Sequence, residues 1–401
     1  MRKKLKDVCM FYSGTGFPIQ YQGQTKGEYP FYKVGDIANN AIAGKIYLEL
    51  CNNYISSDVA KMIKGCILPK DTVVFAKIGE ALKLNRRAIT SCDCLIDNNA
   101  MGIAPKLDSL RIQYFYFCMK NLKMQTLAES TTVPSVRKTV LEKYEIEVPS
   151  LVEQEEIEKK LTLTQKIIEK RRQELSYLDE IIKARFVELF GDPVHNPKDW
   201  TVKSLGELSI QINSGNTPKG GEQVYVEKGI TFFRSQNVWK DRLEMDDIAY
   251  IDEETHASMS RSSLKHGDIL MTKTGRINTE NSSLGRAALY MGEDDAANVN
   301  GHVYFIRLKP GVNNKFILRI LVSDEYRDYI RSVCVGGIDK RQLNKNHIED
   351  FPIICPPDDM VDEYISLVEQ VDKSKFDTMT FAPIYAIINL YLHAHFYQGR
   401  R

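Results

Sequence analysis

The sequence has almost no net charge. Its 54 Lys and Arg residues are balanced by 53 Asp and Glu residues, which leaves +1 over 401 residues. A strongly basic or acidic chain would indicate a partner of opposite charge, and this chain offers no such argument from its total. Local clusters of cations remain compatible with a charged partner, so a partner must be inferred from where particular residues gather.

Long apolar runs are also missing. No stretch approaches the roughly 18 apolar residues of a membrane-spanning helix. The apolar run after the basic N-terminus, Val8 to Tyr12, is too short for a secretory signal. The 8 cysteines include no Cys-x-x-Cys pair and lie mostly in the first third of the chain. We therefore expect a soluble protein of the cytoplasm, with free thiols in place of disulfides or a structural zinc site.

Several catalytic motifs are absent from the chain. Gly-x-x-x-x-Gly-Lys-Ser/Thr does not occur, which excludes a P-loop ATPase, and no Asn-Pro-Pro-Tyr-like segment of an adenine methyltransferase is present. His393 and His395 lack carboxylate or cysteine support, so we interpret them as surface residues rather than metal ligands. Glu158-x-Lys160 resembles the end of a nuclease motif without its upstream acid, and we interpret it as surface charge. The sequence predicts no catalytic, cofactor-binding or metal-binding residue.

The sequence does contain a repeat. The segment that starts at Tyr29, YPFYKVGDI, returns at Ile230 as ITFFRSQNV, and the segment LPKDTVVFAKIG from Leu68 returns at Leu264 as LKHGDILMTKTG. Further on, Val136, Leu141, Ile146 and Pro149 match Leu343, Ile348, Ile353 and Pro356. A period of about 200 residues indicates a duplicated domain rather than a solenoid. Because one chain rarely needs the same chemistry twice but often needs two recognition surfaces, the duplication favours a two-part binder over a single-site enzyme.

The repeat also argues against a cofactor loop. The segment Tyr12 to Gly16, YSGTG, resembles the glycine loops that hold S-adenosylmethionine or a dinucleotide. The equivalent segment, Asn213 to Thr217, keeps the turn residues but lacks the second glycine. We therefore interpret both segments as turns.

Each copy has the pattern of a mixed α/β domain. Short β-branched and aromatic runs, such as Thr72 to Ala76 and Arg87 to Thr90, alternate with clusters of Gly, Asn and Asp and predict strands. One helix is predicted in each copy, over Ile112 to Glu129 and over Asn314 to Val333. Each copy then closes on a short strand that ends at a proline, Pro149 or Pro356 in turn.

A different pattern lies between the two copies. From Ile157 to Leu189, residues that suit a buried seam recur at alternating steps of four and three, which is typical of a coiled coil. The apolar members of this spacer seam are Ile157, Leu161, Ile168, Leu175, Leu178, Ile182 and Leu189. A helix of about 33 residues would extend roughly 50 Å, and Gly191-Asp192-Pro193 would end it.

So polar a helix needs a partner to bury its seam. After the second copy, Val361, Tyr364, Val368 and Val371 have the same spacing, and because each helix follows its own domain we expect the two to be antiparallel. A helical linker packed on one domain is the alternative.

The predicted fold class is α+β, with two similar mixed α/β domains separated by long antiparallel coiled-coil helices and related by a pseudo-two-fold axis. The expected parts are domain 1 at 1–149, the spacer helix at 150–192, domain 2 at 193–356, and a second helix with an atypical tail, interrupted by Pro383, at 357–401.

Cationic and amide side chains gather in equivalent loops of the two copies. Lys and Arg neutralise phosphates, and Asn, Gln and Arg read base edges, so the recurrence favours nucleic acid over merely solvated loops. In the first copy the candidates are Lys33, Lys77, Lys83, Asn85, Arg86, Arg87, Thr131, Ser135 and Arg137. In the second copy they are Arg234, Gln236, Asn237, Lys273, Thr274, Arg276, Asn278, Arg286, Lys340, Arg341, Gln342 and Asn344.

Three segments resemble a known family. They are Tyr144 to Pro149 followed by Glu153-Gln154, Leu178 to Pro193 (LDEIIKARFVELFGDP), and Gly267 to Gly275 (GDILMTKTG). Taken together and with the duplication, they are similar to the DNA specificity subunit of type I restriction-modification systems. The resemblance covers residues 1 to about 376, and the tail departs from it.

The resemblance implies two target recognition domains that each read one half of a split double-stranded DNA target. It implies that the helices set the gap between the half-sites and dock two modification subunits. Methyl transfer and ATP-driven cleavage would belong to modification and restriction subunits, which would hold S-adenosylmethionine, ATP and magnesium, so this chain is expected to be non-catalytic. The alternatives are a coiled-coil scaffold that binds protein partners without reading DNA and an enzyme with an unrecognised site.

Overall fold

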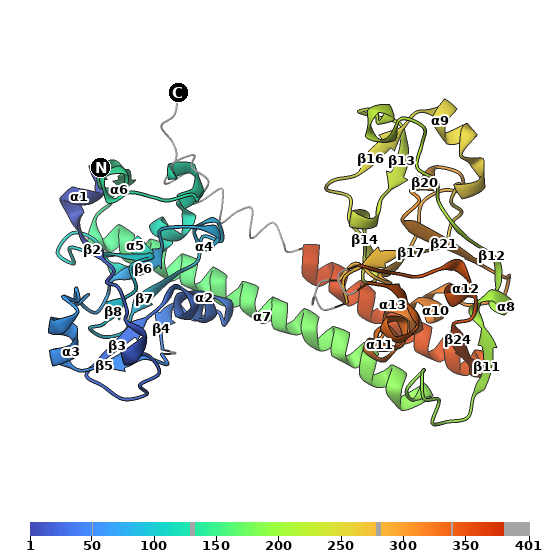
Figure 1. Cartoon of the computed structure of the whole chain (residues 1–401), viewed down its shortest axis with the longest axis horizontal. Helices are drawn as coiled ribbons and strands as arrows, with labels where there is room; N and C mark the ends of the chain where they lie inside the picture. Colours follow the sequence, from blue (N-terminus) through green and yellow to red (C-terminus); the bar gives the residue numbers. More distant parts are fainter. Residues whose placement is uncertain (50, 129–132, 278–281, 338–339, 381–401) are drawn as a thin grey trace. The chain divides into compact units, whose positions relative to one another are not determined.

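The computed structural model describes residues 1–49, 51–128, 133–277, 282–337 and 340–380. Packing divides the chain into two compact units. Unit 1 is built from Met1–Gln173 and unit 2 from Glu174–Asp377, and the long helix α7 (Leu151–Phe190) contributes to both. Each unit contains β-sheets flanked by short helices (Figure 1). The predicted class, mixed α/β sheet regions joined by long helices, is confirmed.

Unit 1 contains a larger sheet, a smaller sheet and a strand pair. The larger sheet has the order β2 (Cys9–Ser13), β9 (Ala100–Pro105), β6 (Val73–Ala76), β7 (Arg87–Thr90) and β4 (Tyr47–Leu48). The smaller sheet has the order β5 (Tyr54–Ile55), β3 (Tyr29–Tyr32) and β8 (Leu95–Ile96), and the pair joins β1 (Arg2–Lys4) to β10 (Glu145–Glu147). Strands β3 and β8 are parallel, whereas the pairs β2–β9, β9–β6 and β6–β7 are antiparallel.

Unit 2 repeats this arrangement. Its larger sheet has the order β12 (Ser209–Ser214), β21 (Val303–Leu308), β17 (Ile269–Thr272) and β19 (Ala287–Leu289). Its smaller sheet has the order β16 (Ala249–Ile251), β13 (Ile230–Phe233) and β20 (Ala297–Val299), and its strand pair joins β11 (Thr201–Ser204) to β24 (Pro352–Cys355). The smaller sheet again contains a parallel pair, between β13 and β20, whereas in unit 1 the larger sheet also has one, between β4 and β7.

The two units agree in register as well as in order. Val73 pairs with Ile103 in unit 1, and the equivalent Ile269 pairs with Ile306 in unit 2. The central strands β6 and β17 are buried at every residue, so the shared register pairs equivalent buried side chains across the sheet in both units. The structure thereby confirms that the repeated segments are one fold used twice.

The helix predicted over Ile112 to Glu129 is shorter than expected. Helix α5 ends at Asn121, and a 3₁₀ turn at Met124–Leu127 follows. The guanidinium of Arg87 donates hydrogen bonds to the carbonyl oxygens of Lys120 and Leu122. These bonds satisfy carbonyl groups at the C-terminus of α5, where the helix itself supplies no donors. Glu129 lies outside the described residues.

The helix predicted over Asn314 to Val333 is two helices. Helix α10 covers Asn314–Val322, helix α11 covers Asp324–Val333, and Ser323 between them is extended, with ψ at 155°. The Ser323 hydroxyl accepts a hydrogen bond from the amide of Tyr326 at 3.2 Å. Serine is a strong N-cap residue, and here it starts a new helix within a continuous amphipathic pattern.

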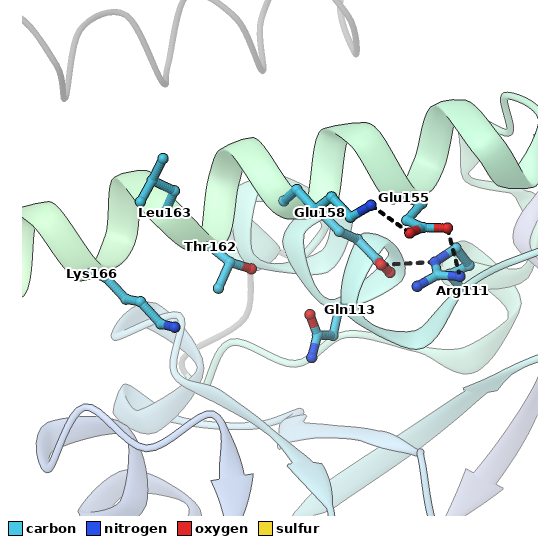
Figure 2. Close-up of a pocket in the computed structure, with 8 residues that line it drawn as sticks. Arg111, Gln113, Glu155, Glu158, Thr162, Leu163 and Lys166 are labelled. Carbon is cyan, nitrogen blue, oxygen red and sulfur yellow. Dashed lines mark hydrogen bonds and ion pairs between the residues drawn. The ribbon is translucent and has the colours of Figure 1, made fainter.

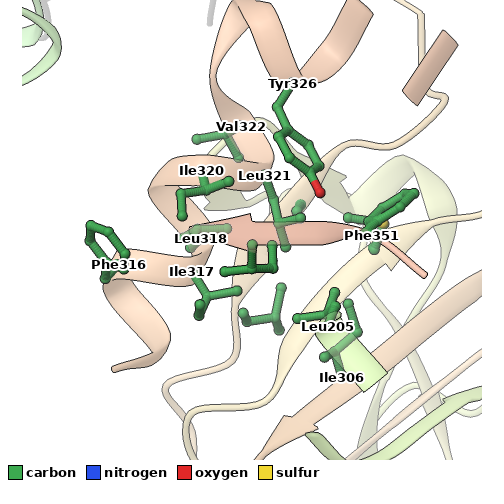
Figure 3. Close-up of a cluster of buried hydrophobic side chains, with 14 of the residues drawn as sticks. Leu205, Ile306, Phe316, Ile317, Leu318, Ile320, Leu321, Val322, Tyr326 and Phe351 are labelled. Carbon is green, nitrogen blue, oxygen red and sulfur yellow. The ribbon is translucent and has the colours of Figure 1, made fainter. Parts of the chain in front are cut away.

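The core of unit 2 is centred on α10. Figure 3 shows its apolar side chains against those of the neighbouring strands, and all six residues from Phe316 to Val322 other than Arg319 are buried. Leu205, Ile306 and Phe351, which come from three distant parts of the chain, complete the cluster. A helix that is apolar on nearly every side must be covered all round, which explains its place inside the unit.

Helix α7 is longer than the predicted seam, with 40 residues. In unit 1, Ile157 and Leu161 are buried in the core, and in unit 2, Ile182 is buried while Leu178 and Leu189 are partly covered. Ile168 and Leu175 are half-buried. The helix ends at Gly191, whose φ of 77° suits the left-handed position that closes a helix.

The second long helix, α13 (Asp358–Thr380), packs on the C-terminal half of α7 within unit 2. Val361, Tyr364, Val368 and Val371, the positions expected to face a partner, are all buried. Asp179 of α7 pairs with Lys375 at 2.6 Å, and Arg185 of α7 pairs with Glu363. Rising numbers on α7 thus meet falling numbers on α13, so the two helices are antiparallel.

The contact between α7 and α13 differs in detail from the predicted seam. Near the end of α7, the rings of Phe186 and Phe190 each lie within 6 Å of the ring of Tyr364, at 5.6 and 5.5 Å between centroids. Both phenylalanines are buried, whereas Arg185 is only half-buried and forms an ion pair. The step of three therefore gives way to steps of four, because the helix here packs on Phe316 of the unit 2 core as well as on α13.

Candidate nucleic-acid interface

In unit 2, two loops that are far apart in the sequence form one small sheet. Its strands are β18 (Thr274–Gly275), β23 (Arg341–Gln342) and β22 (Val335–Gly336). Thr274 pairs with Gln342, and the amide of Leu343 donates to the carbonyl of Lys273 at 2.9 Å. Two of the predicted polar loops are therefore held side by side.

Unit 1 brings the equivalent loops together in the same way. Ile78 forms a β-bridge with Ser135, and the amide of Val136 donates to the carbonyl of Lys77 at 2.9 Å. This bond is the counterpart of the one between Leu343 and Lys273. We name these loops the paired loops: 77–79 with 134–137 in unit 1, and 273–276 with 340–344 in unit 2.

The candidate side chains differ widely in exposure. Exposed are Lys83, Arg137, Gln236, Arg276, Lys340, Gln342 and Asn344. Half-buried are Lys33, Lys77, Asn85, Arg86, Ser135, Arg234, Lys273, Thr274 and Arg341. Buried are Arg87, Asn237 and Arg286, and Thr131 and Asn278 lie outside the described residues. The exposed members include residues of the paired loops in both units.

The buried candidates hold the loops in place. Burial lowers the pKa of the Arg87 guanidinium, which nevertheless stays charged at neutral pH and bonds to backbone carbonyls and to the Asn85 side chain at 2.8 Å. Asn85 itself has a φ of 53° and also accepts from the amide of Met124. Asn237 closes a turn by accepting from the Arg234 amide at 3.0 Å. These side chains have roles inside their own unit.

A further polar group surrounds Asp247 in unit 2. Its carboxylate lies 3.1 Å from the Arg234 guanidinium and accepts from Gln236 at 3.2 Å. The hydrogen bonds from Gln236 and Arg234 lower the pKa of Asp247. In unit 1 the position of Arg234 is taken by Lys33, whose ammonium bonds to Gln22 and lies 5.6 Å from the centre of the Phe17 ring. Both cations follow the equivalent strands β3 and β13.

The glycine turns have a structural cause. A Cβ atom on Gly14 would lie 1.7 Å from the carbonyl oxygen of Asp97, and one on Gly215 would lie 1.9 Å from that of Val299. Any other residue would therefore collide with the end of the neighbouring strand. The two turns were predicted to be equivalent, and they have the same close backbone approach, which explains the glycine without a cofactor.

Glu158 was expected to be a surface charge, and this expectation was wrong. The residue is 5% exposed and accepts hydrogen bonds from Arg111 Nε at 2.7 Å and from the Tyr114 amide at 2.8 Å. Its carboxylate thus satisfies the first turn of α5 and raises the pKa of Arg111. Figure 2 shows this cleft, in which Glu155 also lies near Arg111.

Gln154 is a second polar anchor that the sequence analysis missed. It is fully buried, accepts from the Arg111 amide at 2.8 Å, and donates to the Ser109 carbonyl at 2.9 Å. Together with Glu158 it fixes the N-terminal half of α7 to unit 1. The signal was present, because Gln154 closely follows the proline that ends the copy, but its role required the folded partner.

The remaining negative expectations concern metals, thiols and membranes. Among the residues that the structure describes, no group of three or more His, Cys, Asp or Glu side chains is placed to hold a metal ion. All eight cysteines are free thiols. In the same part of the chain, no helix combines the length and the apolar character required to cross a bilayer. His393 and His395 lie outside the described residues.

Comparison with known proteins assigns the chain to a family. The family model for the type I restriction modification DNA specificity domain matches residues 1–177. The MjaIX specificity subunit of a type I restriction enzyme from Methanocaldococcus jannaschii is 24% identical over 395 residues, which cover 92% of this chain and 85% of that protein. The MjaVIII specificity subunit of the same organism is 24% identical over 353 residues, which cover 83% of this chain and 77% of that protein.

Solved structures show that the fold is shared over the whole chain. The S subunit of a type I restriction-modification system from M. genitalium matches with a TM-score of 0.54 at 12% identity, covering 100% of this chain and 96% of that one. A structure reported for the complex assembly and conformational transition of the type I R-M system matches with a TM-score of 0.50 at 14% identity, covering 98% and 97%. With the duplicated topology and the matching sequences, the chain belongs to the specificity subunits of type I restriction-modification systems, the non-catalytic components that direct such complexes to their DNA targets.

Proposed function

We propose that each unit reads one half of a bipartite double-stranded DNA target through its paired loops. The observation that carries the proposal is the recurrence of the paired loops: the same backbone bond joins Lys77 to Val136 and Lys273 to Leu343. A loop pair that is joined by backbone hydrogen bonds just after a central strand presents its side chains with little loss of entropy on binding. Two such surfaces in one chain fit a target with two half-sites.

The side chains of these loops have the chemistry that duplex DNA requires. Exposed Arg137, Arg276 and Lys340 can neutralise phosphates, and exposed Gln342 and Asn344 offer amide groups of the kind that read base edges in the major groove. The buried members, such as Arg87, support the loops from within. The recognised bases therefore depend on the exposed members.

The proposed parts follow the repeat. Residues 1–149 and 193–356 are the target recognition domains, 150–192 is the spacer helix, and 357–401 contains the second helix and the tail. The helices set the gap between the half-sites and dock two modification subunits, and restriction subunits complete the assembly. S-adenosylmethionine, ATP and magnesium act in those partner subunits, and the complex works in the cytoplasm.

The test exchanges one domain at a time in the assembled complex. Residues 1–149 are replaced by the equivalent domain of another specificity subunit, and the methylated sites of the genome are mapped. One half-site should change while the other half and the gap stay the same. The reciprocal exchange of residues 193–356 is the matched control and should change the opposite half. A change in both half-sites from either exchange would refute the modular proposal.

The role of the helices is tested separately. Seven residues are inserted within 169–173, where every residue is exposed and which precedes the segment that contacts α13. The inserted heptad should lengthen the gap in the recognised sequence and leave both half-sites unchanged. An unchanged gap would count against the helices as a spacer.

The salt dependence of duplex binding tests the alternative of a protein-binding scaffold. Phosphate contacts make affinity fall steeply with salt, so duplex binding that does not depend on salt would favour the scaffold.

A further inference from the structure

A hairpin in unit 2 carries an unusual pair of aromatic and cationic side chains. Strands β14 (Val238–Trp239) and β15 (Arg242–Leu243) place Trp239 opposite Arg242. The guanidinium of Arg286 lies 3.9 Å from the centre of the Trp239 ring, and that of Arg242 lies 5.3 Å from it. Arginine stacks favourably on an aromatic face while keeping its edge donors available. The indole ring therefore orients two cations.

Helix α11 supplies the opposite wall. Asp324, Arg327, Asp328 and Arg331 are spaced three, four and seven residues from the first, which places them on one face of the helix. The cleft between this face and the hairpin is lined by Trp239, Lys240, Ser282, Arg286, Asp324, Arg327, Asp328 and Arg331. We name it the Trp–Arg cleft.

The hairpin is firmly attached to the unit. The carboxylate of Asp241, at its tip, pairs with Arg319 of α10 at 2.5 Å, and its amide donates to the carbonyl of Ala287 at 2.8 Å. Asp241 has a φ of 62°, a conformation that suits the tight turn between β14 and β15. These contacts fix one wall of the cleft before any ligand arrives.

Cations outnumber carboxylates around the cleft. Asp324 is already paired with Lys240 at 2.8 Å and with Lys183 at 3.2 Å. Asp328 is paired with Arg331 at 2.7 Å. Within the part of the chain that the structure describes, no carboxylate forms an ion pair with Arg327, which is half-buried. Its guanidinium is therefore the group with the most to gain from an added anion.

The electrostatic environment agrees with this geometry. Burial and the neighbouring Arg331 lower the pKa of Arg327 despite the opposing effect of Asp324 and Asp328, and burial, Arg327 and Arg242 lower the pKa of Arg286. The lowered pKa values show that Arg327 and Arg286 are each partly shielded from water and lie near other positive charges. An anion placed between them would relieve both costs.

We propose that the Trp–Arg cleft binds a phosphate group, with Arg327 as its principal ligand and Arg286 held toward it by Trp239. The planar fork of a guanidinium matches two oxygens of a phosphate. The phosphate comes either from the backbone of a duplex bound by unit 2, a source that rests on the proposed function, or from a free nucleotide or inorganic phosphate. In unit 1 the position of Trp239 is occupied by Ala38 of helix α2 (Val34–Ile42), so the cleft belongs to unit 2.

The experiment compares the full chain with Arg327→Gln, Arg327→Lys and the control Arg261→Gln, which removes an exposed cation elsewhere in unit 2. The first probe is inorganic phosphate at constant ionic strength, read as a shift in thermal midpoint. The second is duplex DNA, read as the slope of log affinity against log salt. Phosphate should stabilise the wild type and Arg261→Gln equally, Arg327→Lys less because lysine lacks the planar fork, and Arg327→Gln not at all. If the ligand is a backbone phosphate, Arg327→Gln should reduce the slope by about 0.9, the value of one phosphate contact.

The outcomes separate the two sources. A lost thermal shift with an unchanged DNA slope supports the cleft and assigns it to a free phosphate, whereas a reduced slope assigns it to the duplex. Equal thermal shifts and equal slopes in all four proteins would overturn the proposal. If no form binds duplex DNA, the proposed function fails and the phosphate titration alone decides the cleft.

Discussion

Unit 1 and unit 2 share strand order and register but complete their interiors with different chemistry. Unit 1 has Thr72 and Ala104 where unit 2 has Asp268 and Arg307, which form an ion pair at 2.7 Å between a buried carboxylate and a partly exposed guanidinium. The central strands β6 and β17 are buried at every residue in both units. The apolar pattern of the strands therefore maintains the fold, while the polar residues at their ends were free to diverge.

The connections diverge further than the strands. After β3, unit 1 continues into the nine-residue helix α2, whereas unit 2 follows β13 with a 3₁₀ turn and the β14–β15 hairpin. The hairpin brings Trp239 and Arg242 to a surface that has no counterpart in unit 1. One scaffold can thus present two different surfaces, as a target with two unlike half-sites would require.

The two halves of α7 show the same contrast. Its N-terminal half is fixed to unit 1 by Ile157 and Leu161 together with the buried polar anchors Gln154 and Glu158. Its C-terminal half is fixed within unit 2 by the rings of Phe186 and Phe190. Polar anchors require exact hydrogen-bond partners, whereas an aromatic cluster depends on packing, so the two attachments should respond differently to substitution.

The largest expected effect distinguishes the Asp268–Arg307 ion pair of unit 2 from the uncharged residues at the same positions of unit 1. Asp268→Ala should destabilise unit 2 by about 3–5 kcal/mol, because Arg307 loses the carboxylate that it contacts at 2.9 and 2.7 Å. Thr72→Val should cost unit 1 about 1 kcal/mol, the typical value of one hydrogen bond, here from the Thr72 hydroxyl to the Pro69 carbonyl. Urea titration with pulse proteolysis, with fragments assigned to each unit, measures both.

A paired replacement serves as the control for this comparison. Asp268→Leu combined with Arg307→Met removes both charges and should recover most of the loss, since an ion pair replaced by apolar groups is often neutral. A double variant as unstable as Asp268→Ala would show that the site needs the charges themselves. Equal costs for Asp268→Ala and Thr72→Val would remove the proposed contrast between the units.

The second expected effect concerns alkaline pH. Burial raises the pKa of Cys9 to about 12 and also raises the pKa values of Cys94 and Cys118, all in unit 1. Thiols of the unfolded chain ionise near pH 8.5, so between about pH 8.5 and 12 the unfolded chain releases protons that the folded unit keeps. The stability provided by the protonated thiols is complete below that window and is lost as the pH rises through it.

The measurement compares urea midpoints of each unit at pH 8 and pH 10. Each thiol that stays protonated in the folded unit should lower the free energy of unfolding of unit 1 by about 2 kcal/mol at pH 10. Cys94→Ala should reduce the pH dependence of unit 1 by that amount, whereas Cys92→Ala, which changes an exposed thiol, should leave it unchanged. A pH dependence that is identical in wild type and Cys94→Ala would contradict the role of burial.

The third expected effect tests the polar anchor of α7. Glu158→Gln should destabilise unit 1 by about 1–3 kcal/mol, because the charged acceptor of Arg111 and of the Tyr114 amide is lost. The Tyr114 amide should also exchange its hydrogen faster, which a general loss of packing would not confine to this position. Glu155→Gln is the matched control on the same helix and, being half-exposed, should change stability by less than about 1 kcal/mol. Similar losses of stability from both substitutions would show that Glu158 contributes no more than an ordinary surface charge.

The sequence predicted the duplication, the fold class and the antiparallel helices because these depend on periodic apolar residues. Its failures occurred where a single polar side chain decides the local structure. Ser323 starts a new helix inside a continuous amphipathic pattern, and Arg87 ends α5 from a strand that lies far away in the sequence. Such contacts exist only after the chain has folded, so no local pattern signals them.

The candidate interface was predictable to a smaller extent. The sequence identified both groups of polar loops, and the structure adds that Ile78 lies beside Ser135 and Thr274 beside Gln342. Which members are exposed could not be predicted, since Arg87 and Arg276 are both arginines in polar loops and only the second reaches the surface. The Trp–Arg cleft was missed because Trp239 and the arginines of α11 lie outside the repeated segments, although Arg286 was among the candidates.

The smallest expected effect concerns the ion pairs along the helix pair in unit 2. Lys375 and Asp179 lie 2.6 Å apart, and the carboxylate of Asp179 is mostly exposed to solvent. A double-mutant cycle with Lys375→Ala and Asp179→Ala should give a coupling of about 0.2–1 kcal/mol that decreases as salt rises. Phe190→Ala, in the aromatic cluster of the same pair, should cost several-fold more and should not depend on salt. A coupling that rivals the loss from Phe190→Ala would mean that charge and not packing holds the helices together, and the contrast drawn between the two halves of α7 would then fail.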